Sequence, residues 1–336
     1  MAPKASPETT LKSIDVKLLY FLQRFRFLTA EQAVRLVGER QHSEKPTTRF
    51  RALQEAGYIA GFGGSNLHGE DREIAEDVLG QGSSCKVWYL LQKGYDYLCH
   101  ETDIAMELLG LFHGRGNPRW SSHTPHRIKM IDVAIAFDRA IHARGQNIVL
   151  EQIYFDFDIH RAASGKIGRE TDMEGLRGPA GPRVRPDLTL LLAKVDYETI
   201  EAEFGRKRRR EVRTRRRIPI EIDCRTDTVL SAITNDPAHR DLATRYLLYD
   251  QILNESGISD LASTQGAEDN FVLLTVSPDE RRNQDIRNKI SLQDVDVAND
   301  RNFRFATFAQ VEADPLGAIW LTRKPEKHDF ITALEP

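Results

Sequence analysis

The chain has 336 residues with 47 Lys or Arg and 50 Asp or Glu, which gives a formal net charge of −3. With 29% charged and 40% hydrophobic residues, the composition is typical of a folded globular protein and excludes a disordered chain. No apolar run approaches the roughly 20 residues of a membrane helix, and the N-terminus lacks the apolar segment of a secretory signal. Cys85, Cys99 and Cys224 are odd in number and widely spaced, which argues against a disulfide framework. We therefore expect a cytoplasmic protein with no membrane partner.

The small net charge hides two segments of opposite charge. Nine of the twelve residues in 206–217 are Lys or Arg, and Glu211 is the only acid among them. Residues 70–77 hold five acids and one arginine. Charge gathered in blocks indicates binding partners better than the sum does, so the net charge does not exclude a nucleic-acid partner.

Residues 11–100 are predicted to form a first domain of helices and one hairpin. Apolar residues at a spacing of about four in 14–25 indicate a first helix. Thr29 and Gln32 have the spacing of a capping box that begins a second helix. Proline is favoured at the first position of a helix, so Pro46 is expected to begin a third.

The third helix, 46–56, precedes two strand-like segments at 58–62 and 86–91, and this order predicts a winged helix-turn-helix. Phe50 and Leu53 are expected to face its core. The side chains left for DNA are Thr47, Thr48, Arg49, Arg51 and Gln54. Thr and Gln bond base edges, and arginines reach guanine or phosphate. The alternative is a protein-interaction module, since the acidic segment at 70–77 would repel phosphate.

A connector at 101–125 is expected to lead to a second domain at 126–336. Helices are predicted at 126–144, 228–253 and 279–290, and strands at 148–159, 184–192, 218–224 and 271–276. Helices that alternate with strands indicate an α/β domain with a mixed sheet, so the whole chain is predicted to be α+β.

Four carboxylates lie in the predicted strands of this second domain: Glu151, Asp187, Glu221 and Asp223. Glu221 and Asp223 are two residues apart, so a strand directs both side chains to one face. Charges inside apolar strands are costly unless they are paired or bind a cation. Asp187 and Glu221, with Glu151 as a further ligand, are therefore candidate ligands for Mg²⁺.

These residues resemble the pattern of the PD-(D/E)xK restriction-endonuclease-like fold, and more specifically the replication-relaxation family of plasmids and mobile elements. The resemblance rests on a winged helix followed by His126 at the head of a helix and by three short motifs. The motifs are Arg185-Pro186-Asp187, Glu221-Ile-Asp-Cys-Arg-Thr226, and Arg245-Tyr246 with Tyr249. The resemblance covers about residues 15 to 290. It implies a DNA-binding protein with a nuclease-like domain, whose site residues would be Asp187, Glu221 and Asp223.

One residue departs from the nuclease pattern. Asp223 occupies the position where an active nuclease of this fold has a lysine that stabilises charge at phosphorus. Arg240 and Arg245 are the only cationic substitutes that follow, and an arginine is always protonated. Three interpretations stay open: a silent nuclease-like domain, a Mg²⁺-dependent nuclease, and a structural role in which the acids pair with Arg185 or Arg225.

The basic segment, residues 206–217, is expected to be a loop between strands that is mobile without a polyanion. Its candidate DNA contacts are Arg206, Lys207, Arg208, Arg209, Arg210, Arg213, Arg215, Arg216 and Arg217. Neutralising phosphates with these side chains would give salt-dependent affinity. A solvated hairpin, a partner-binding loop and an RNA-binding arm are the alternatives.

Together the patterns predict a protein of a plasmid or mobile element that binds double-stranded DNA in replication, transfer or transcription control. It would be associated with the nucleoid or the plasmid. Helix-turn-helix proteins commonly bind palindromic sites, so we expect a homodimer. The alternatives are a Mg²⁺-dependent endonuclease or nickase and an adaptor that binds replication or conjugation proteins.

Overall fold

The computed structural model shows a mixed α/β chain that divides into two compact units, Met1–Ile131 and Asp132–Pro336. The described residues are 11–38, 45–63, 69, 72–73, 76, 86–109, 112, 120–121, 123–145, 147–156, 159–161, 167–169, 186–202, 206–224, 245–246, 249–250, 272–291, 302–323 and 327–328. The prediction of an α+β chain is thereby confirmed at the level of fold class. No helix in the described part of the chain is both long enough and apolar enough to cross a membrane.

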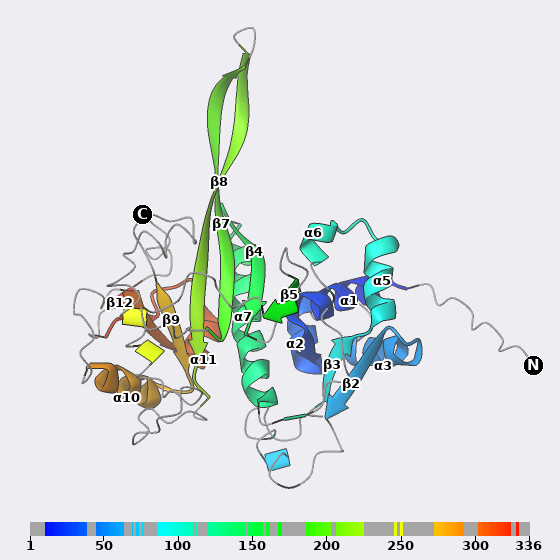
Figure 1. Cartoon of the computed structure of the whole chain (residues 1–336), viewed down its shortest axis with the longest axis horizontal. Coiled ribbons are helices and arrows are strands. Elements are labelled where there is room, and N and C mark those ends of the chain that lie inside the picture. Colours follow the sequence, from blue (N-terminus) through cyan, green and yellow to red (C-terminus); the bar gives the residue numbers. More distant parts are fainter. Residues whose placement is uncertain are drawn as a thin grey trace, which may run out of the picture. The chain divides into compact units, whose positions relative to one another are not determined.

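The N-terminal unit contains short helices around a small sheet (Figure 1). Its elements are α1 (Ser13–Phe25), β1 (Phe27–Thr29), α2 (Ala30–Val37), α3 (Pro46–Glu55), β2 (Ile59–Gly63), β3 (Lys86–Leu90), α5 (Gln92–His100) and α6 (Met106–Leu109). β3 lies between β1 and β2 and is antiparallel to both. Most of the acidic segment at 70–77 lies outside the described residues.

Local sequence signals set the boundaries of these helices. The Thr29 hydroxyl accepts a hydrogen bond from the Gln32 amide, and the Gln32 side chain accepts one from the Thr29 amide, so the predicted capping box is confirmed. Pro46 is the first residue of α3. Gly57 follows the helix with a φ of 74°, a left-handed conformation that glycine adopts without a Cβ clash.

The predicted apolar face of α3 packs into the core of the unit. Phe50 and Leu53 are almost fully buried, and the Phe50 ring stacks on Trp88 of β3 with centroids 5.2 Å apart. Trp88 is itself 8% exposed, so it is a core residue. With this side buried, most of the polar side chains of α3 face outward.

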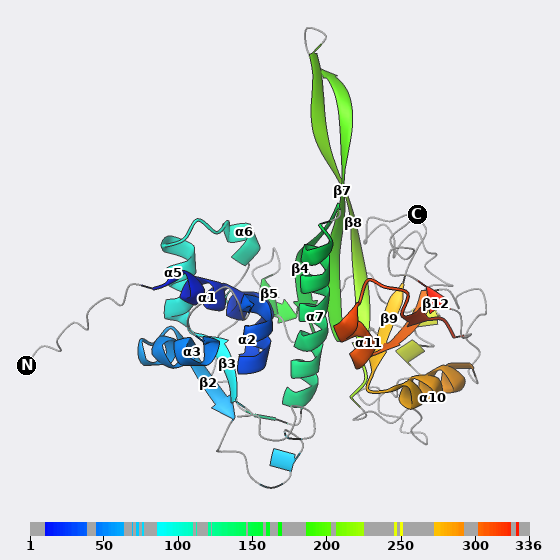
Figure 2. The same cartoon turned by 180° about the vertical axis from the view of Figure 1, so that it is seen from behind.

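The C-terminal unit is built on a seven-stranded sheet (Figures 1 and 2). Its sheet strands are β4 (Ile148–Phe155), β7 (Leu188–Ala202), β8 (Arg206–Ile222), β9 (Leu273–Ser277), β10 (Phe303–Thr307), β11 (Trp320–Leu321) and β12 (Lys327–His328). β5 (Ile159–Arg161) and β6 (Ile167–Arg169) form a separate pair. The helices are α7 (Thr124–Arg144), which begins before the unit's first residue, α10 (Glu280–Ser291) and α11 (Phe308–Ala313).

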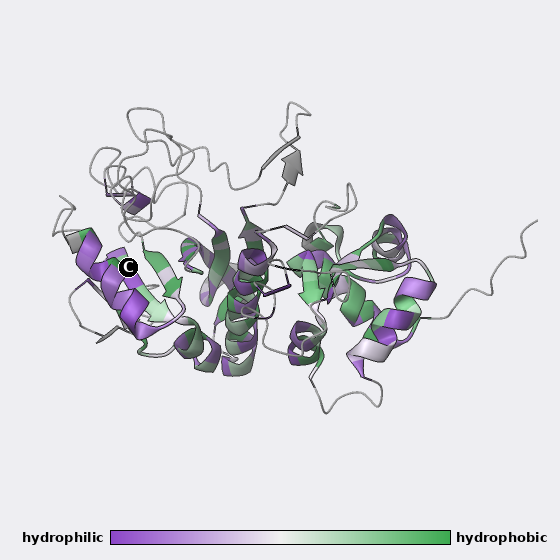
Figure 3. Cartoon of the chain, turned by 90° about the horizontal axis from the view of Figure 1, so that it is seen from below, coloured by the Kyte–Doolittle hydropathy of each residue, from purple (hydrophilic) through white to green (hydrophobic). Residues whose placement is uncertain are grey.

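The sheet order is β12-β11-β10-β9-β8-β7-β4, and its centre is mixed. β4, β7 and β8 form an antiparallel meander, whereas β9 is parallel to β8 and β10 is parallel to β9. β9 and β10 are buried along their whole length, and the neighbouring helix α10 is mainly hydrophilic (Figure 3). Runs that are buried on both faces are typical of parallel pairing.

The helix predicted at 126–144 begins two residues earlier, at Thr124. Pro125 therefore lies in the first turn, where its missing N–H is tolerated, and it belongs to the helix and not to the predicted connector. Of the helix predicted at 228–253, only the helical residues 245–246 and 249–250 are described.

The basic segment is a strand, which corrects the prediction of a loop. Every residue from Arg206 to Arg217 belongs to β8 and pairs with β7. β4 pairs with β7 only as far as Lys194, and β9 pairs with β8 only at Ile220–Ile222. The outer parts of β7 and β8 therefore extend beyond the sheet as a two-stranded ribbon (Figure 1).

Candidate functional site

The exposed side of α3 carries most of the predicted DNA contacts. Thr47, Thr48, Arg51 and Gln54 are all exposed. The Lys86 ammonium, at the start of β3, donates a 3.4 Å hydrogen bond to the Gln54 side chain and lies 4.1 Å from the centroid of the Trp88 ring. Lys86 thus adds a positive charge to this surface that the sequence alone did not indicate. These residues form a polar, basic surface of hydrogen-bonding groups, and the exposed Glu55 at the end of α3 places one carboxylate beside it.

Arg49 is held by an internal ion pair. Its Nε and terminal nitrogen donate to the two carboxylate oxygens of Asp15 at 2.7 and 2.6 Å. The Asp15 side chain is fully buried and that of Arg49 is 12% exposed. The guanidinium that was predicted to reach DNA therefore connects α3 to α1. Its position one turn before the buried Leu53 is the sequence signal that places it beside the core.

Asp187 and Glu221 lie together, as the sequence predicted. Asp187 immediately precedes β7 and accepts a 2.8 Å hydrogen bond from the Ile222 amide of β8. Glu221 is completely buried and accepts 2.8 Å hydrogen bonds from Arg245 and from the Tyr249 hydroxyl. A hydrogen bond also joins the two carboxyl groups, and such a bond requires that one of them holds a proton.

Burial raises the pKa of Glu221 to about 8. The Arg245 charge acts in the opposite direction, while the neighbouring Asp187 charge raises the pKa further. Desolvation dominates because the side chain has no access to water. At neutral pH the pair therefore shares one proton, and Glu221 is mainly neutral. Burial also raises the pKa of Tyr246 and of Tyr249 well above the usual tyrosine value.

Asp223 is paired with an arginine from far along the chain. Its two oxygens accept hydrogen bonds of 2.6 and 3.0 Å from Arg282 of α10, and its side chain is fully buried. One interpretation of the sequence gave these acids a structural role, in which they pair with Arg185 or Arg225. Both arginines lie outside the described residues. The ion pairs that are described use Arg245 for Glu221 and Arg282 for Asp223. Arg282 lies 59 positions after Asp223, so no local motif indicates it.

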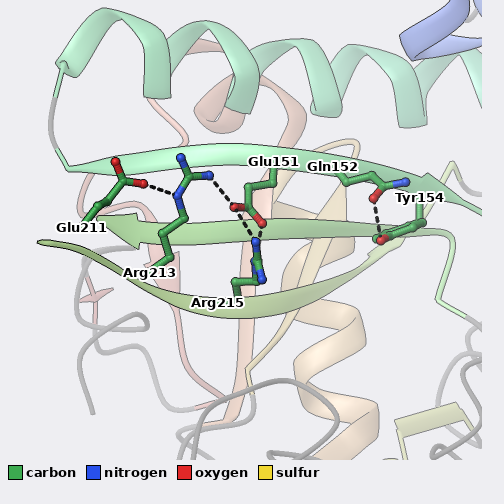
Figure 4. Close-up of polar contacts among 6 residues, drawn as sticks. All are labelled: Glu151, Gln152, Tyr154, Glu211, Arg213 and Arg215. Carbon is green, nitrogen blue, oxygen red and sulfur yellow. Dashed lines mark hydrogen bonds and ion pairs between the residues drawn. The ribbon is translucent and has the colours of Figure 1, made fainter. Parts of the chain in front are cut away.

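Glu151, the third predicted metal ligand, does not join this cluster. It lies at a bulge in β4 and accepts hydrogen bonds from Arg213 and Arg215 (Figure 4). Asp187 lies near the opposite end of β4, where its carbonyl accepts a bond from the Asp156 amide. Five residues of strand, about 16 Å, separate Asp156 from Glu151. Within the described ranges, no group of three acidic, histidine or cysteine side chains is arranged to hold a metal ion.

Three buried hydroxyl groups belong to segments next to the acidic pair. Thr189 of β7 lies two positions after Asp187, Thr275 of β9 lies in register with Glu221, and Tyr246 is close enough to both carboxyls for their charges to affect its pKa. None of these hydroxyls has a hydrogen-bond partner in the described part of the structure. The site thus combines two carboxyls, an arginine and polar groups with unused bonding capacity.

The basic segment alternates between the two sides of β8. Arg209, Arg210, Arg213 and Arg215 are exposed, Arg217 is half-buried and Arg216 is buried. Burial lowers the pKa of Arg216. The side chains of Arg206, Lys207 and Arg208 lie outside the described residues, although their backbone pairs with β7. The strand therefore places the arginines at odd-numbered positions on one face of the sheet and those at even-numbered positions on the other.

Comparisons of the sequence with protein-family models and with curated proteins found no match, and comparison of the structure with solved structures found none either.

Proposed function

We propose that this protein binds double-stranded DNA, with the N-terminal unit acting as a winged helix whose recognition helix is α3. The observation that carries the proposal is the division of α3 into two sides. Phe50 and Leu53 are buried on one side, and Thr47, Thr48, Arg51 and Gln54 are exposed on the other. A helix that presents such groups to solvent is suited to the major groove. β2 and β3 correspond to the strands of the wing.

The second unit is proposed to be a nuclease-like domain that does not cut DNA. Arg245 donates to Glu221, and Arg282 donates to both oxygens of Asp223. A divalent cation at these carboxylates would be repelled by the arginines and would have to displace the proton shared with Asp187. From the motif resemblance alone, we propose that the protein belongs to a plasmid or mobile element, acts in replication, transfer or transcription control, and is associated with the nucleoid. A homodimer is proposed because helix-turn-helix proteins commonly bind palindromic sites.

The recognition helix is tested by selecting bound fragments from a genomic library and measuring affinity for the selected site. Arg51→Ala combined with Gln54→Ala should lower the preference for that site over a scrambled duplex at least tenfold, because each good base contact contributes about 1–3 kcal/mol. Lys17→Ala, an exposed change on α1, should leave the preference unchanged. An unchanged preference in the double variant would exclude α3 as the reading helix.

The alternative function is a Mg²⁺-dependent nuclease, and the contact between Asp187 and Glu221 is the observation in its favour. Supercoiled plasmid incubated with the protein and Mg²⁺ or Mn²⁺ should stay intact if the domain is silent. Nicking that requires the metal and is lost in Asp187→Ala would instead establish the nuclease. An adaptor for replication or conjugation proteins is favoured if the chain binds no DNA even at low salt.

A further inference from the structure

The paired strands β7 and β8 have two chemically different faces. In an antiparallel pair, residues directly opposite each other point to the same side, and successive residues alternate. Arg209, Arg213, Arg215 and Arg217 pair in register with Thr199, Val195, Ala193 and Leu191. All of these residues therefore lie on one face, which we call the arginine face. Arg210 pairs with Glu198 on the opposite face.

Charge is segregated between these faces. The described part of the arginine face has four arginines and one acid, Glu211, and Glu151 of β4 pairs with Arg213 and Arg215 there, so the charge of this face is +2. The exposed charged residues described on the opposite face are Lys194, Asp196, Glu198 and Arg210, which sum to zero. Asp196 and Lys194 lie 3.8 Å apart. Only one face of the β7–β8 pair therefore attracts a polyanion.

The arginine face is held in an extended arrangement before any partner binds. Glu151 accepts hydrogen bonds from Arg213 at 2.9 Å and from Arg215 at 2.7 Å, and Glu211 also pairs with Arg213 (Figure 4). Arg209 lies over the ring of Tyr197, and Arg217 over that of Tyr154. Even so, Arg213 and Arg215 are 43% and 59% exposed. Restraining flexible side chains before binding lowers the entropy lost in the complex.

The arginine face extends from the two-stranded ribbon into the sheet. Asp196–Ala202 and Arg206–Val212 pair only with each other among the described residues, and Arg209 lies in this stretch. Arg213, Arg215 and Arg217 lie beside it, where β4 adds a third strand to β7 and β8. Arginines spread over such a surface are suited to contact the phosphates of a duplex.

The side chains on this face favour a duplex over a single strand. Proteins that bind single strands stack successive bases on several aromatic side chains. Tyr197, which is 54% exposed, is the only strongly exposed aromatic residue in the described ranges. Guanidinium groups predominate on the arginine face, and they bind phosphates and guanine edges.

We propose that the arginine face, and not the opposite face of β7 and β8, contacts the phosphates of duplex DNA. This inference rests on the proposed DNA-binding function, and it specifies which surface of the second unit binds and which groups of the duplex it contacts.

The test compares two double variants of the full chain that each remove two positive charges from neighbouring positions. Arg209→Ala with Arg213→Ala changes the arginine face, and Lys194→Ala with Arg210→Ala changes the opposite face. Thermal unfolding establishes that both variants are folded. The first should bind duplex at least tenfold more weakly in 150 mM salt, with a slope of log affinity against log salt reduced by about two. The second should bind within twofold of the wild type.

Each outcome decides between the claims. Equal losses in the two variants, or no loss in the first, would overturn the one-sided contact even if the wild type binds DNA. Absence of binding by the wild type would instead contradict the proposed function itself. Binding to single strands that is tighter than binding to duplex would exclude a duplex as the partner of the arginine face.

Discussion

Asp15→Ala should lower the free energy of unfolding by about 3–5 kcal/mol, the cost of leaving a buried charge without its partner. The Asp15 carboxylate is fully buried and accepts both hydrogen bonds of the Arg49 fork. It also accepts a 2.8 Å bond from the Lys12 amide at the start of α1. The substitution thus removes a helix cap and takes the Asp15 carboxylate away from Arg49, whose side chain is only 12% exposed. Urea unfolding measures the loss, and hydrogen exchange locates it in α1 and α3.

Two controls isolate the ion pair from its surroundings. Lys17→Ala, on the exposed side of α1, should change stability by less than about 0.5 kcal/mol. Combining Asp15→Ala with Arg49→Met should cost less than the sum of the single changes, because no unpaired charge remains. If Asp15→Ala matches Lys17→Ala, the ion pair does not hold α3 on α1.

Glu221→Gln should become progressively more stable than the wild type as the pH rises from 5 to 8. The pKa of Glu221 is about 8 in the folded chain against an ordinary value of 4.5, so the folded state binds more protons across this interval. The stabilisation linked to that proton is complete below about pH 4.5 and is lost as the pH rises through 8. The difference in unfolding free energy should grow by up to about 1.4 kcal/mol per pH unit.

Glutamine is suited to this test because it mimics the neutral carboxyl. Its oxygen can accept from Tyr249 and Arg245, and its amide can donate to Asp187. Urea unfolding of both proteins at pH 5, 6.5 and 8 gives the difference directly. A difference that stays constant with pH, or that moves in favour of the wild type at pH 8, would show that Glu221 is ionised throughout and that Arg245 outweighs burial.

The sequence predicted the N-terminal unit best where its signals are local. The capping box at Thr29, the helix start at Pro46 and the glycine after α3 are each set by neighbouring backbone groups, and they lie where expected. The pairing of Arg49 with Asp15 spans 34 positions. Their spacing says only that both can lie near a core, so the sequence could not show that they meet.

The basic segment shows why composition alone misleads. Like charges at successive positions repel in an isolated peptide, and this favours the prediction of a loop. In β8 the alternation of strand side chains separates neighbouring arginines onto opposite faces, and β7 supplies the backbone partners. Glu151, from a third strand, compensates Arg213 and Arg215. These contacts exist only after the sheet has formed, so no property of residues 206–217 indicates them.

The acidic cluster was predictable in part. Alternation placed Glu221 and Asp223 on one side of a strand, and both lie close enough to Tyr246 for their charges to affect its pKa. Glu151 was expected to lie beside these acids, but it lies elsewhere on the sheet, because the sequence does not fix the register of β4 against β7. Register decides which carboxylates meet, and it is set by packing across the whole sheet.

The central claim is tested most directly by the affinity of the full chain for duplex DNA, measured by fluorescence anisotropy at salt concentrations between 50 and 300 mM. We expect binding that weakens steeply with salt. The slope of log affinity against log salt should be about −3 or more negative, since each neutralised phosphate contributes about −0.9. Absence of binding at 50 mM salt, or an affinity that does not change with salt, would contradict DNA binding through the arginine face and α3.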